Sequence, residues 1–340
     1  MTTLEFEHRP AAHCENGVIA NMFRFYGFDT ISEPMIFGLS SGLFFGHMPF
    51  VKMWDMAFTT FRTFAGVLFK RVTRSLGFKT KTKRYFFNKE RAMQELDEVL
   101  QSGTPVGCVA GMYYLTYLPM EFRYHFNGHN LCVIGKDEQE NYIISDPITI
   151  EKVSISRKDF IRSRFAKGGA FPSFGKMYWI TSVPDKLPDL APLIRKAIKH
   201  NCWLMTSQPK WIPYVGINGI YYLSKKIRTW EQKMGKRKAA LNLAQIIRML
   251  EEIGTVGACF RYMYAAFLQQ SAGITGISEL NVFSQRLTEI GDLWRDFAYK
   301  TARVFKERQG ELHTYDELGD VLYKIAELEE AFFKELKTVV

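Results

Sequence analysis

Three prolines between residues 183 and 192 divide the chain into two parts with different residue patterns. The first part contains short apolar runs with the composition of strands: PVGCVAGMYYL, HNLCVIG, NYIISD and KMYWITS. The second part has helical periodicity almost throughout, which predicts helices near 190–201, 217–233, 239–270, 277–308 and 314–337. Because proline interrupts regular structure, we predict an α+β domain over 1–185 with an antiparallel sheet, followed by a mainly α-helical domain over 190–340.

Two helices are predicted within the first part. The run VIANMFRFY, residues 18–26, has apolar residues on one face and is followed by Gly27 as a stop signal. This helix places Cys14 at or just before its N-terminus. The next segment, SEPMIFGLSSGLFFG, is interrupted by three glycines and predicts a packed loop with short elements. A second amphipathic helix is predicted over 89–102.

The charge balance favours an acidic partner. The 340 residues include 45 Lys and Arg against 35 Asp and Glu, which gives a formal net charge of +10. The strongest local bias lies between residues 62 and 91, where ten basic residues accompany the single acid Glu90. Because no nucleotide-binding, zinc-finger or RNA-recognition motif accompanies this tract, we expect no nucleic-acid partner.

We predict a cytoplasmic chain without a membrane span. Its longest stretch free of charged residues, 34–51, contains His47, serines and glycines and is too polar for a bilayer. The N-terminus, MTTLEFEHRP, lacks the basic and apolar regions of a secretion signal. The cysteines never form a CxxC pair, so we expect free thiols. His125 and His129 have the spacing of a zinc-binding helix, but the Asn127-Gly128 step argues against a helix, and no metal is predicted.

A predicted hairpin brings an imidazole close to a carboxylate. If the turn between HNLCVIG and NYIISD is centred on Asp137 or Glu138, then His129 lies opposite Asp146 or Pro147. A carboxylate beside an imidazole fixes its tautomer and stabilises its protonated form. The sequence therefore predicts that these two side chains are neighbours at the open end of the hairpin.

Cys14 supplies the nucleophile that such a pair requires. A helix N-terminus and a nearby imidazolium both lower the pKa of a thiol below its free value of about 8.5. Cys14, His129 and Asp146 therefore form a chemically complete triad. The alternative is that all three are structural, with a small core cysteine, a histidine bonded to backbone and an aspartate that forms the turn of an Asp-Pro step.

Three segments resemble the family of butirosin-biosynthesis protein H. HCENGVIANMFRFYGFDTISEPMIFGLSSGLFF resembles the family's opening, and MYYLTYLPMEFRYHFNGHNLCVIGKD followed by ISDP is similar to its histidine strand and aspartate. GTVGACFRYMYAAFLQQSA is similar to the signature of the helical domain of unknown function that usually follows. The chain has Ser40-Ser41-Gly42 where relatives have a glycine-rich triplet, and Gly111-Met112 where an acid often precedes the tyrosines. Both differences bear on which acceptor molecule is used more than on the chemistry of the Cys14, His129 and Asp146 triad.

The resemblance implies a papain-like cysteine-enzyme fold in which Cys14, His129 and Asp146 match the triad positions. It also implies an acyltransferase that needs no cofactor. Such an enzyme takes an acyl or aminoacyl group from the phosphopantetheine thioester of an acidic acyl carrier protein, holds it as an acyl-cysteine, and passes it to an amine or hydroxyl of a small-molecule acceptor in the biosynthesis of a specialised metabolite or lipid. The basic tract over 70–91, with a lesser cluster at 225–228, is the candidate docking surface for the carrier.

Two histidines near Cys14 are further candidates. His8 lies six residues before Cys14, where papain-like enzymes often place a glutamine, and is a candidate oxyanion donor beside the backbone N–H of Cys14. His13 is a candidate for shaping the substrate entrance, although adjacent residues at a helix start point apart, which favours a structural role.

Three charged residues are candidates for substrate binding. Glu15 and Glu33 match recurrent family acids and are candidates for binding an amine, while Glu15 is equally well explained as an acid in the first turn of a helix. Arg261 is a lone cation in the apolar run GACFRYMYAAFL. It either pairs with another helix or binds an anionic ligand group.

Two other functions stay open at this stage. A papain-like cysteine peptidase or amide hydrolase uses the same triad with water in place of the acceptor. A non-catalytic binding protein keeps the fold for recognition. The helical part either covers the catalytic part and lines its pocket or forms a homodimer interface, and the pattern does not choose between them.

Overall fold

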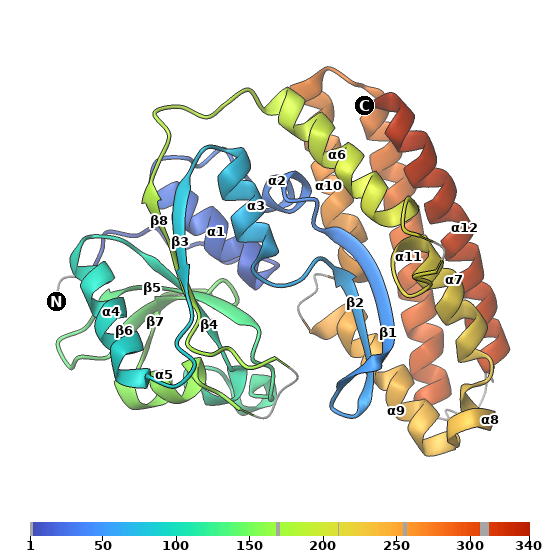
Figure 1. The fold of residues 1–340 in the computed structure, drawn as a ribbon, viewed down its shortest axis with the longest axis horizontal. Helices are drawn as coiled ribbons and strands as arrows, with labels where there is room; N and C mark the ends of the chain where they lie inside the picture. The colour runs from blue at the N-terminus through green and yellow to red at the C-terminus, as the bar shows by residue number, and fades with distance from the viewer. Residues whose placement is uncertain (1–2, 168–170, 210, 254–256, 307–312) are drawn as a thin grey trace. The chain divides into compact units, whose positions relative to one another are not determined.

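The computed structural model shows a mixed α/β chain with antiparallel sheets and a helical C-terminal region (Figure 1). It describes residues 3–167, 171–209, 211–253, 257–306 and 313–340. The chain separates into two compact units, Met1–Ile36 with Ala65–Pro188 and Phe37–Phe64 with Asp189–Val340. The last of the three crossings between the units, at Pro188, falls within the proline-rich linker. Residues 37–64, however, pack with the helical unit rather than with the segments that precede and follow them in sequence.

The first unit is built on one six-stranded antiparallel sheet, in the order β3-β8-β4-β5-β6-β7. The four apolar runs predicted as strands form β4, β5, β6 and β8, but the first of them ends at Ala110, and a short 3-10 helix over Met112–Tyr114 replaces the rest of the predicted strand. The two edge strands were not predicted, because β3 (KTKTK) is almost wholly exposed and β7 has three residues. The strands are β3 (Lys79–Lys83), β4 (Val106–Ala110), β5 (His129–Lys136), β6 (Tyr142–Ser145), β7 (Val153–Ile155) and β8 (Met177–Ser182).

Helices pack against this sheet through their apolar faces. α1 packs on β5, and one face of α4 joins alternate residues of β4 and β5, among them Cys108, Leu131 and Val133, in a single core cluster. The predicted helices over 18–26 and 89–102 correspond to α1 and α4. The helices of this unit are α1 (Cys14–Phe25), α3 (Val67–Ser75), α4 (Lys89–Gln101) and α5 (Arg157–Arg164).

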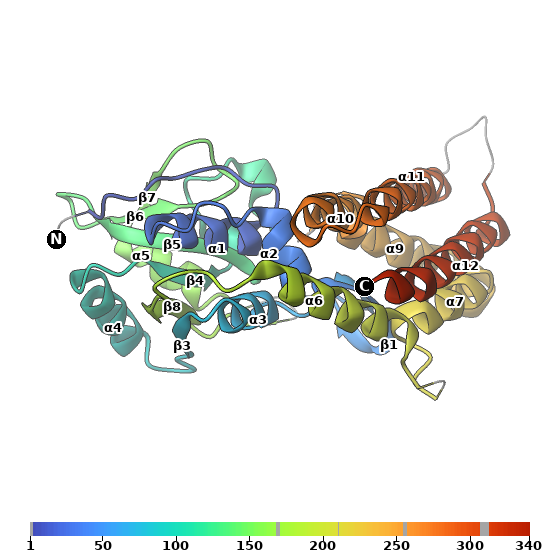
Figure 2. The same cartoon turned by 90° about the horizontal axis from the view of Figure 1, so that it is seen from above.

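The second unit combines a β-hairpin with seven described helices. In the hairpin, β1 (Leu43–Met53) pairs with β2 (Met56–Arg62), and α2 (Glu33–Leu39) precedes it. α11 packs against both α10 and α12 (Figure 2). The helices are α6 (Leu190–Thr206), α7 (Gly216–Ile227), α8 (Trp230–Met234), α9 (Lys236–Ile247), α10 (Arg261–Thr275), α11 (Glu279–Lys306) and α12 (Tyr315–Val339). Every described helix of the chain is too short or too polar to cross a bilayer.

The prediction of a packed loop over 32–46 is wrong at its C-terminal end, because the long strand β1 begins at Leu43. Phe45 of β1 stacks on Trp294 of α11 with ring centroids 5.9 Å apart, and Phe61 of β2 meets the same indole edge-on at 5.3 Å. Because these contacts join segments more than two hundred residues apart in sequence, local glycine content could not predict the strand.

The predicted single helix over 239–270 is also wrong. α9 gives way to a π-helical turn over Arg248–Glu252, and α10 begins only at Arg261; residues 254–256 lie outside the described residues. Ala258, Cys259 and Phe260 have φ angles of 44°, 47° and 67°, a left-handed turn that costs backbone energy for residues other than glycine. A guanidinium N–H of Arg261 donates to the carbonyl of Cys259 at 2.9 Å and braces this turn.

Arg261 forms a fully buried ion pair with Glu329 of α12. Its Nε and Nη2 donate to the two carboxylate oxygens at 2.8 and 2.9 Å, and Trp294 Nε1 donates to the first of these oxygens at 2.7 Å. Both charged side chains are 0% exposed. Of the two roles predicted for Arg261, the pair with another helix is the one observed, and its assignment to substrate binding is corrected.

We expect Glu329→Gln to lower the free energy of unfolding by about 3–5 kcal/mol, because it leaves a buried guanidinium without its counter-charge. Urea unfolding of the full chain, followed by circular dichroism, measures this loss. The matched control is Glu335→Gln in the same helix, which removes the partner of the half-exposed Arg286 and should leave unfolding close to wild type. Equal losses in the two variants would contradict the importance of the buried pair.

Candidate active site

The chain segment that leads into α1 is anchored by a carboxylate. Glu33 accepts hydrogen bonds from the backbone N–H groups of Ala12 and His13, both at 3.0 Å. His13 is the N-cap of α1, and its Nδ1 accepts from the N–H of Asn16 at 3.4 Å. Burial raises the pKa of Glu33 in spite of the two N–H groups. Glu33 and His13 therefore fix the backbone on either side of the start of α1, and their predicted contact with substrate stays a prediction.

Glu15 also anchors backbone rather than facing open solvent. Its side chain is buried, and Oε1 accepts from the N–H of Gly66 at 2.8 Å. Gly66, with φ of 84°, immediately precedes α3. This bond ties the first turn of α1 to the start of α3. Its structural role as an acid in the first turn is observed, and the prediction that Glu15 binds an amine stays a prediction.

His129 and Asp146 meet in a buried pair at one end of the sheet. His129 is the first residue of β5, and Asp146 directly follows β6. Nε2 of the imidazole lies 2.8 Å from Oδ2 of the carboxylate, and the two residues are 2% and 0% exposed. The sequence prediction that these side chains are neighbours is therefore realised in the structure.

The predicted pairing of the hairpin strands is offset by one to two residues from the observed one. Cys132 pairs with Ser145, and an irregularity between Val133 and Gly135 separates this part of the ladder from the part next to the turn. His129 is consequently not directly opposite Asp146. The two side chains meet just beyond the last ladder pair, where the strand ends no longer constrain them.

Cys14 completes the set from the N-terminus of α1. Burial by itself lowers the pKa of His129, but the charge and hydrogen bond of Asp146, together with the hydrogen bond and charge of Cys14, outweigh it and raise the pKa to about 10. Because Nε2 is engaged by Asp146, Nδ1 is the ring nitrogen left for the Cys14 thiol. The raised pKa of His129 favours the protonated ring, and an imidazolium beside a thiol at a helix start favours the thiolate.

Two further groups hold the carboxylate, and sequence reasoning missed both. The phenol of Tyr117 donates to Oδ2 of Asp146 at 2.6 Å, and the backbone N–H of Ile148 donates to Oδ1 at 3.2 Å. Tyr117 lies in MYYLTYLPM, where Tyr113 and Tyr114 carry the same chemistry. Nothing in the local pattern distinguishes the tyrosine that reaches the site.

The predicted oxyanion donor His8 has both ring nitrogens in hydrogen bonds to residues near Asp146. Its Nδ1 lies 2.8 Å from the hydroxyl of Ser145, and its Nε2 lies 3.1 Å from the carbonyl of Thr149. A carbonyl only accepts, so Nε2 carries the proton and Nδ1 accepts from the serine. Both ring nitrogens are thus used to hold the N-terminal segment against the residues on either side of Asp146.

The remaining cysteines differ from Cys14 in their surroundings. All five are free thiols, as predicted, and the other four are completely buried. Burial raises the pKa of each of these four thiols: Cys108, Cys132, Cys202 and Cys259. Within the described ranges, His, Cys, Asp and Glu form no group of three or more that is arranged to hold a metal.

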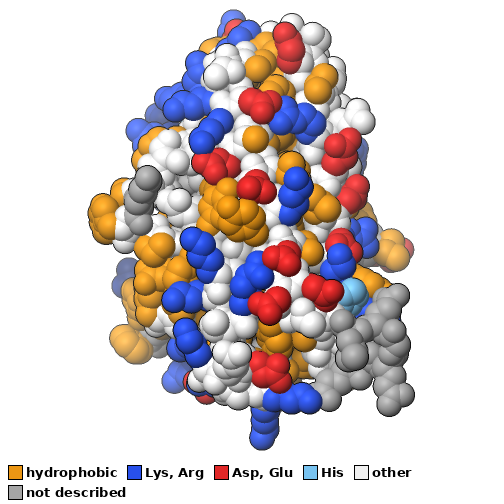
Figure 3. All heavy atoms as spheres, turned by 90° about the vertical axis from the view of Figure 1, so that its right-hand side faces the viewer, with side chains coloured by type: hydrophobic (Ala, Val, Ile, Leu, Met, Phe, Trp, Pro, Cys, Tyr) orange, Lys and Arg blue, Asp and Glu red, His pale blue; other side chains and the backbone are white. Residues whose placement is uncertain are grey.

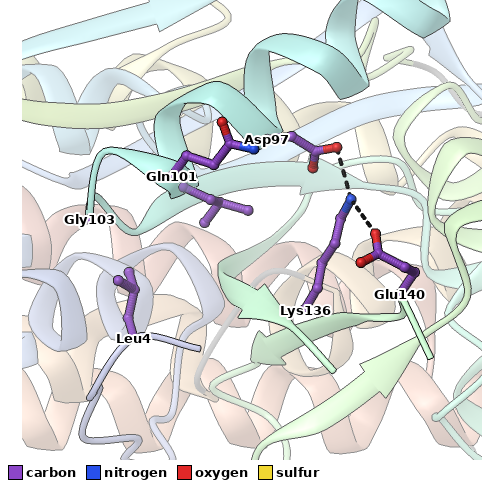
Figure 4. A pocket seen from close by; sticks show the side chains of 7 residues that line it. Leu4, Asp97, Gln101, Gly103, Lys136 and Glu140 are labelled. Atoms are coloured by element: carbon purple, nitrogen blue, oxygen red, sulfur yellow. Dashed lines mark hydrogen bonds and ion pairs between the residues drawn. The ribbon is translucent and has the colours of Figure 1, made fainter. Parts of the chain in front are cut away.

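A pocket at the other end of β5 is separate from this site (Figure 4). Lys136, the last residue of β5, points into it and pairs with Asp97 at 2.9 Å and with Glu140 at 3.2 Å. The phenol of Tyr142 donates to the second oxygen of Asp97 at 2.9 Å. The charges that line this pocket therefore satisfy one another.

We expect Asp146→Asn to reduce alkylation of Cys14 by iodoacetamide at pH 6–7 by at least about tenfold, because without the carboxylate the pKa of His129 falls and the imidazolium that stabilises the thiolate is lost. The reactive thiolate should then form only near the pKa of an ordinary thiol, about 8.5. Intact mass against time and pH measures the rate. Asp97→Asn, which removes another carboxylate that accepts from a tyrosine, should retain the wild-type profile. If Asp146→Asn kept the wild-type dependence of Cys14 alkylation on pH, the role of the His129–Asp146 pair in activating the thiol would be contradicted.

Two family models together cover most of the chain. Residues 13–147 match the family model described as butirosin biosynthesis protein H, N-terminal. Cys14, His129 and Asp146 lie within this matched range. Residues 158–336 match a domain of unknown function, DUF4872. No curated protein matches the chain. The chain belongs to the family in which the N-terminal domain of butirosin biosynthesis protein H is followed by this helical domain of unknown function.

Proposed function

We propose that this chain is a cysteine-dependent acyltransferase of papain-like architecture. Cys14 is the nucleophile, His129 transfers protons, and Asp146 orients the imidazole. The observation that carries the proposal is the buried His129–Asp146 pair, whose second ring nitrogen serves a cysteine at the first position of a helix. Membership in a family of biosynthetic proteins supports transfer to an acceptor over hydrolysis.

The first half-reaction forms an acyl-enzyme. The Cys14 thiolate attacks the carbonyl carbon of a thioester, and the new C–S bond gives a tetrahedral oxyanion. The backbone N–H of Cys14, in the first turn of α1, is the proposed oxyanion donor. Collapse of the intermediate breaks the original C–S bond, and the leaving thiolate takes the proton that His129 carries.

The second half-reaction regenerates the ion pair. Once Cys14 is acylated, its negative charge is gone and His129 is neutral, so the imidazole can act as a base. An amine or hydroxyl of the acceptor attacks the acyl-cysteine while His129 takes its proton, and Cys14 leaves as the thiolate. Asp146 again faces an imidazolium, which restores the arrangement seen in the structure.

A basic surface on the edge strand suits an acidic carrier as the acyl donor. Lys79 and Lys81 of β3 are exposed, and Phe86 and Phe87, just beyond the strand, are 54% and 94% exposed. Exposed cations around exposed aromatic rings fit an acidic protein with an apolar contact. Over the face shown in Figure 3, by contrast, acidic and basic side chains are interspersed.

Strand register supports a short path from the Lys83 end of β3 to the proposed triad. Lys83 pairs with Met177, Met177 with Cys108, and Cys108 with Leu131, which is two residues from His129. Lys79 and Lys81 lie further along β3, and three strand spacings with two residues along β5 put the nearer end of the strand, Lys83, about 16 Å from His129. This separation lies within the reach of an extended phosphopantetheine arm.

Intact mass tests the proposed chemistry directly. We expect purified wild-type chain, incubated with acyl-pantetheine or acyl-carrier thioesters, to gain one acyl increment that Cys14→Ser never acquires. Cys202→Ser, a buried thiol in the helical unit, should still acquire it. Rapid alkylation of Cys14 without any acylation by thioesters would instead favour the peptidase or amidase. Slow alkylation as well would favour a non-catalytic binding protein.

Charge reversal tests the docking surface. We expect Lys79→Glu with Lys81→Glu to slow acylation by the carrier-bound donor at least about fivefold at low salt, because steering by opposite charge is lost. Acylation by the small acyl-pantetheine should not change. Lys225→Glu with Lys226→Glu gives the same change of net charge in the lesser basic cluster. Equal slowing by both pairs would contradict a specific surface on β3.

A further inference from the structure

We propose that Tyr117 is a positioning residue for the Cys14–His129 pair, acting through the carboxylate of Asp146; this inference rests on the proposed function. Tyr117 belongs to the segment between β4 and β5, residues 111–128, which we call the β4–β5 loop. Its role would be to fix the direction of the carboxylate and to limit how tightly that carboxylate holds the imidazolium.

The first argument is that one oxygen serves two donors. Oδ2 of Asp146 accepts from the phenol of Tyr117 at 2.6 Å and faces Nε2 of His129 at 2.8 Å, while Oδ1 accepts from the N–H of Ile148 at 3.2 Å. Rotation of the carboxylate would break at least one of these bonds. The phenol therefore fixes which carboxylate oxygen faces His129 and the direction from which that oxygen approaches the imidazole.

The second argument is that the β4–β5 loop is braced where it presents Tyr117. Nε of Arg123 donates to the carbonyl of Leu118 at 2.7 Å, and the same guanidinium donates to the carbonyl of Thr116. The two carbonyls that flank Tyr117 are thus held by one side chain. Leu115 and Leu118 are buried in the core cluster of the sheet. The phenol is positioned by this brace and by the core.

The third argument concerns charge. A hydrogen bond from a neutral donor disperses the negative charge of a carboxylate oxygen, so the oxygen attracts the adjacent imidazolium less strongly. Burial and the charge of Asp146 keep the pKa of Tyr117 well above 10, so its phenol remains a donor at neutral pH. Removal of the phenol should therefore leave His129 held more tightly and make it a weaker acid toward the leaving thiolate.

The groups around the pair define what else can titrate. Asp146 and Cys14 act most strongly on His129, and Asp146 acts on Tyr117. Tyr178 of β8 interacts with the charges of Glu15 and Cys14, and burial keeps its pKa well above 10. A shift in the pKa of His129 therefore reflects a change in its interaction with Asp146 or with Cys14. The variants described below distinguish these two causes.

The test is the pKa of His129 in the full chain, followed by NMR of ¹³Cε1-labelled histidines from pH 6 to 11 and assigned with His129→Gln. We expect Tyr117→Phe to raise this pKa by at least about half a unit. Tyr142→Phe is the matched control, because it removes a buried tyrosine that donates to Asp97 at the opposite end of β5. It should leave the pKa of His129 unchanged.

A second variant keeps the phenol and loosens its support. Arg123→Gln removes the brace on Thr116 and Leu118, and we expect a smaller shift in the same direction. An unchanged or lowered pKa of His129 in both Tyr117→Phe and Arg123→Gln would overturn the proposal, as would an equal shift in Tyr142→Phe. The titration uses no acyl donor, so failure of acyl transfer would overturn the proposed function alone.

Discussion

The buried pair of His129 and Asp146 is the interaction on which the rest of the site depends. A carboxylate removed from water is costly unless its oxygens are bonded and its charge is matched. The surrounding chain meets that requirement from several directions, with the phenol of Tyr117, the N–H of Ile148 and the imidazole itself. His8 ties the N-terminal segment to the residues beside the carboxylate.

Cys14 reaches this pair because acidic side chains fix the backbone around it. Glu33 binds the two N–H groups just before α1, and Glu15 ties the first turn to the start of α3. Family resemblance alone assigned these acids to an amine substrate. Their observed bonds are to backbone N–H groups, so they hold the chain on both sides of Cys14 in place.

The sequence predicted those features that local pattern determines. Alternating apolar runs predicted the central strands, and a hairpin brings its open ends together even when its register slips, so His129 and Asp146 were correctly paired in spite of the irregularity at Gly135. Long-range packing was beyond this reasoning. The strand that carries Phe45 forms because Trp294, far along the chain, covers it. Tyr117 was hidden among neighbouring tyrosines, and only the folded loop shows which of them reaches Asp146.

Each unit contains a buried ion pair with the same arrangement of donors around one carboxylate oxygen. The two pairs differ in whether the cation can release a proton. In each, one carboxylate oxygen binds both a cation and an aromatic donor: Glu329 with Arg261 and Trp294, and Asp146 with His129 and Tyr117. A guanidinium does not release its proton in a protein, so the first pair can only hold α10 and α12 together. An imidazolium does release its proton, and a thiol stands beside it. The same arrangement around a carboxylate therefore stabilises the helical unit, and in the unit that carries Cys14 it surrounds a cation that is able to give up its proton, as the proposed function requires.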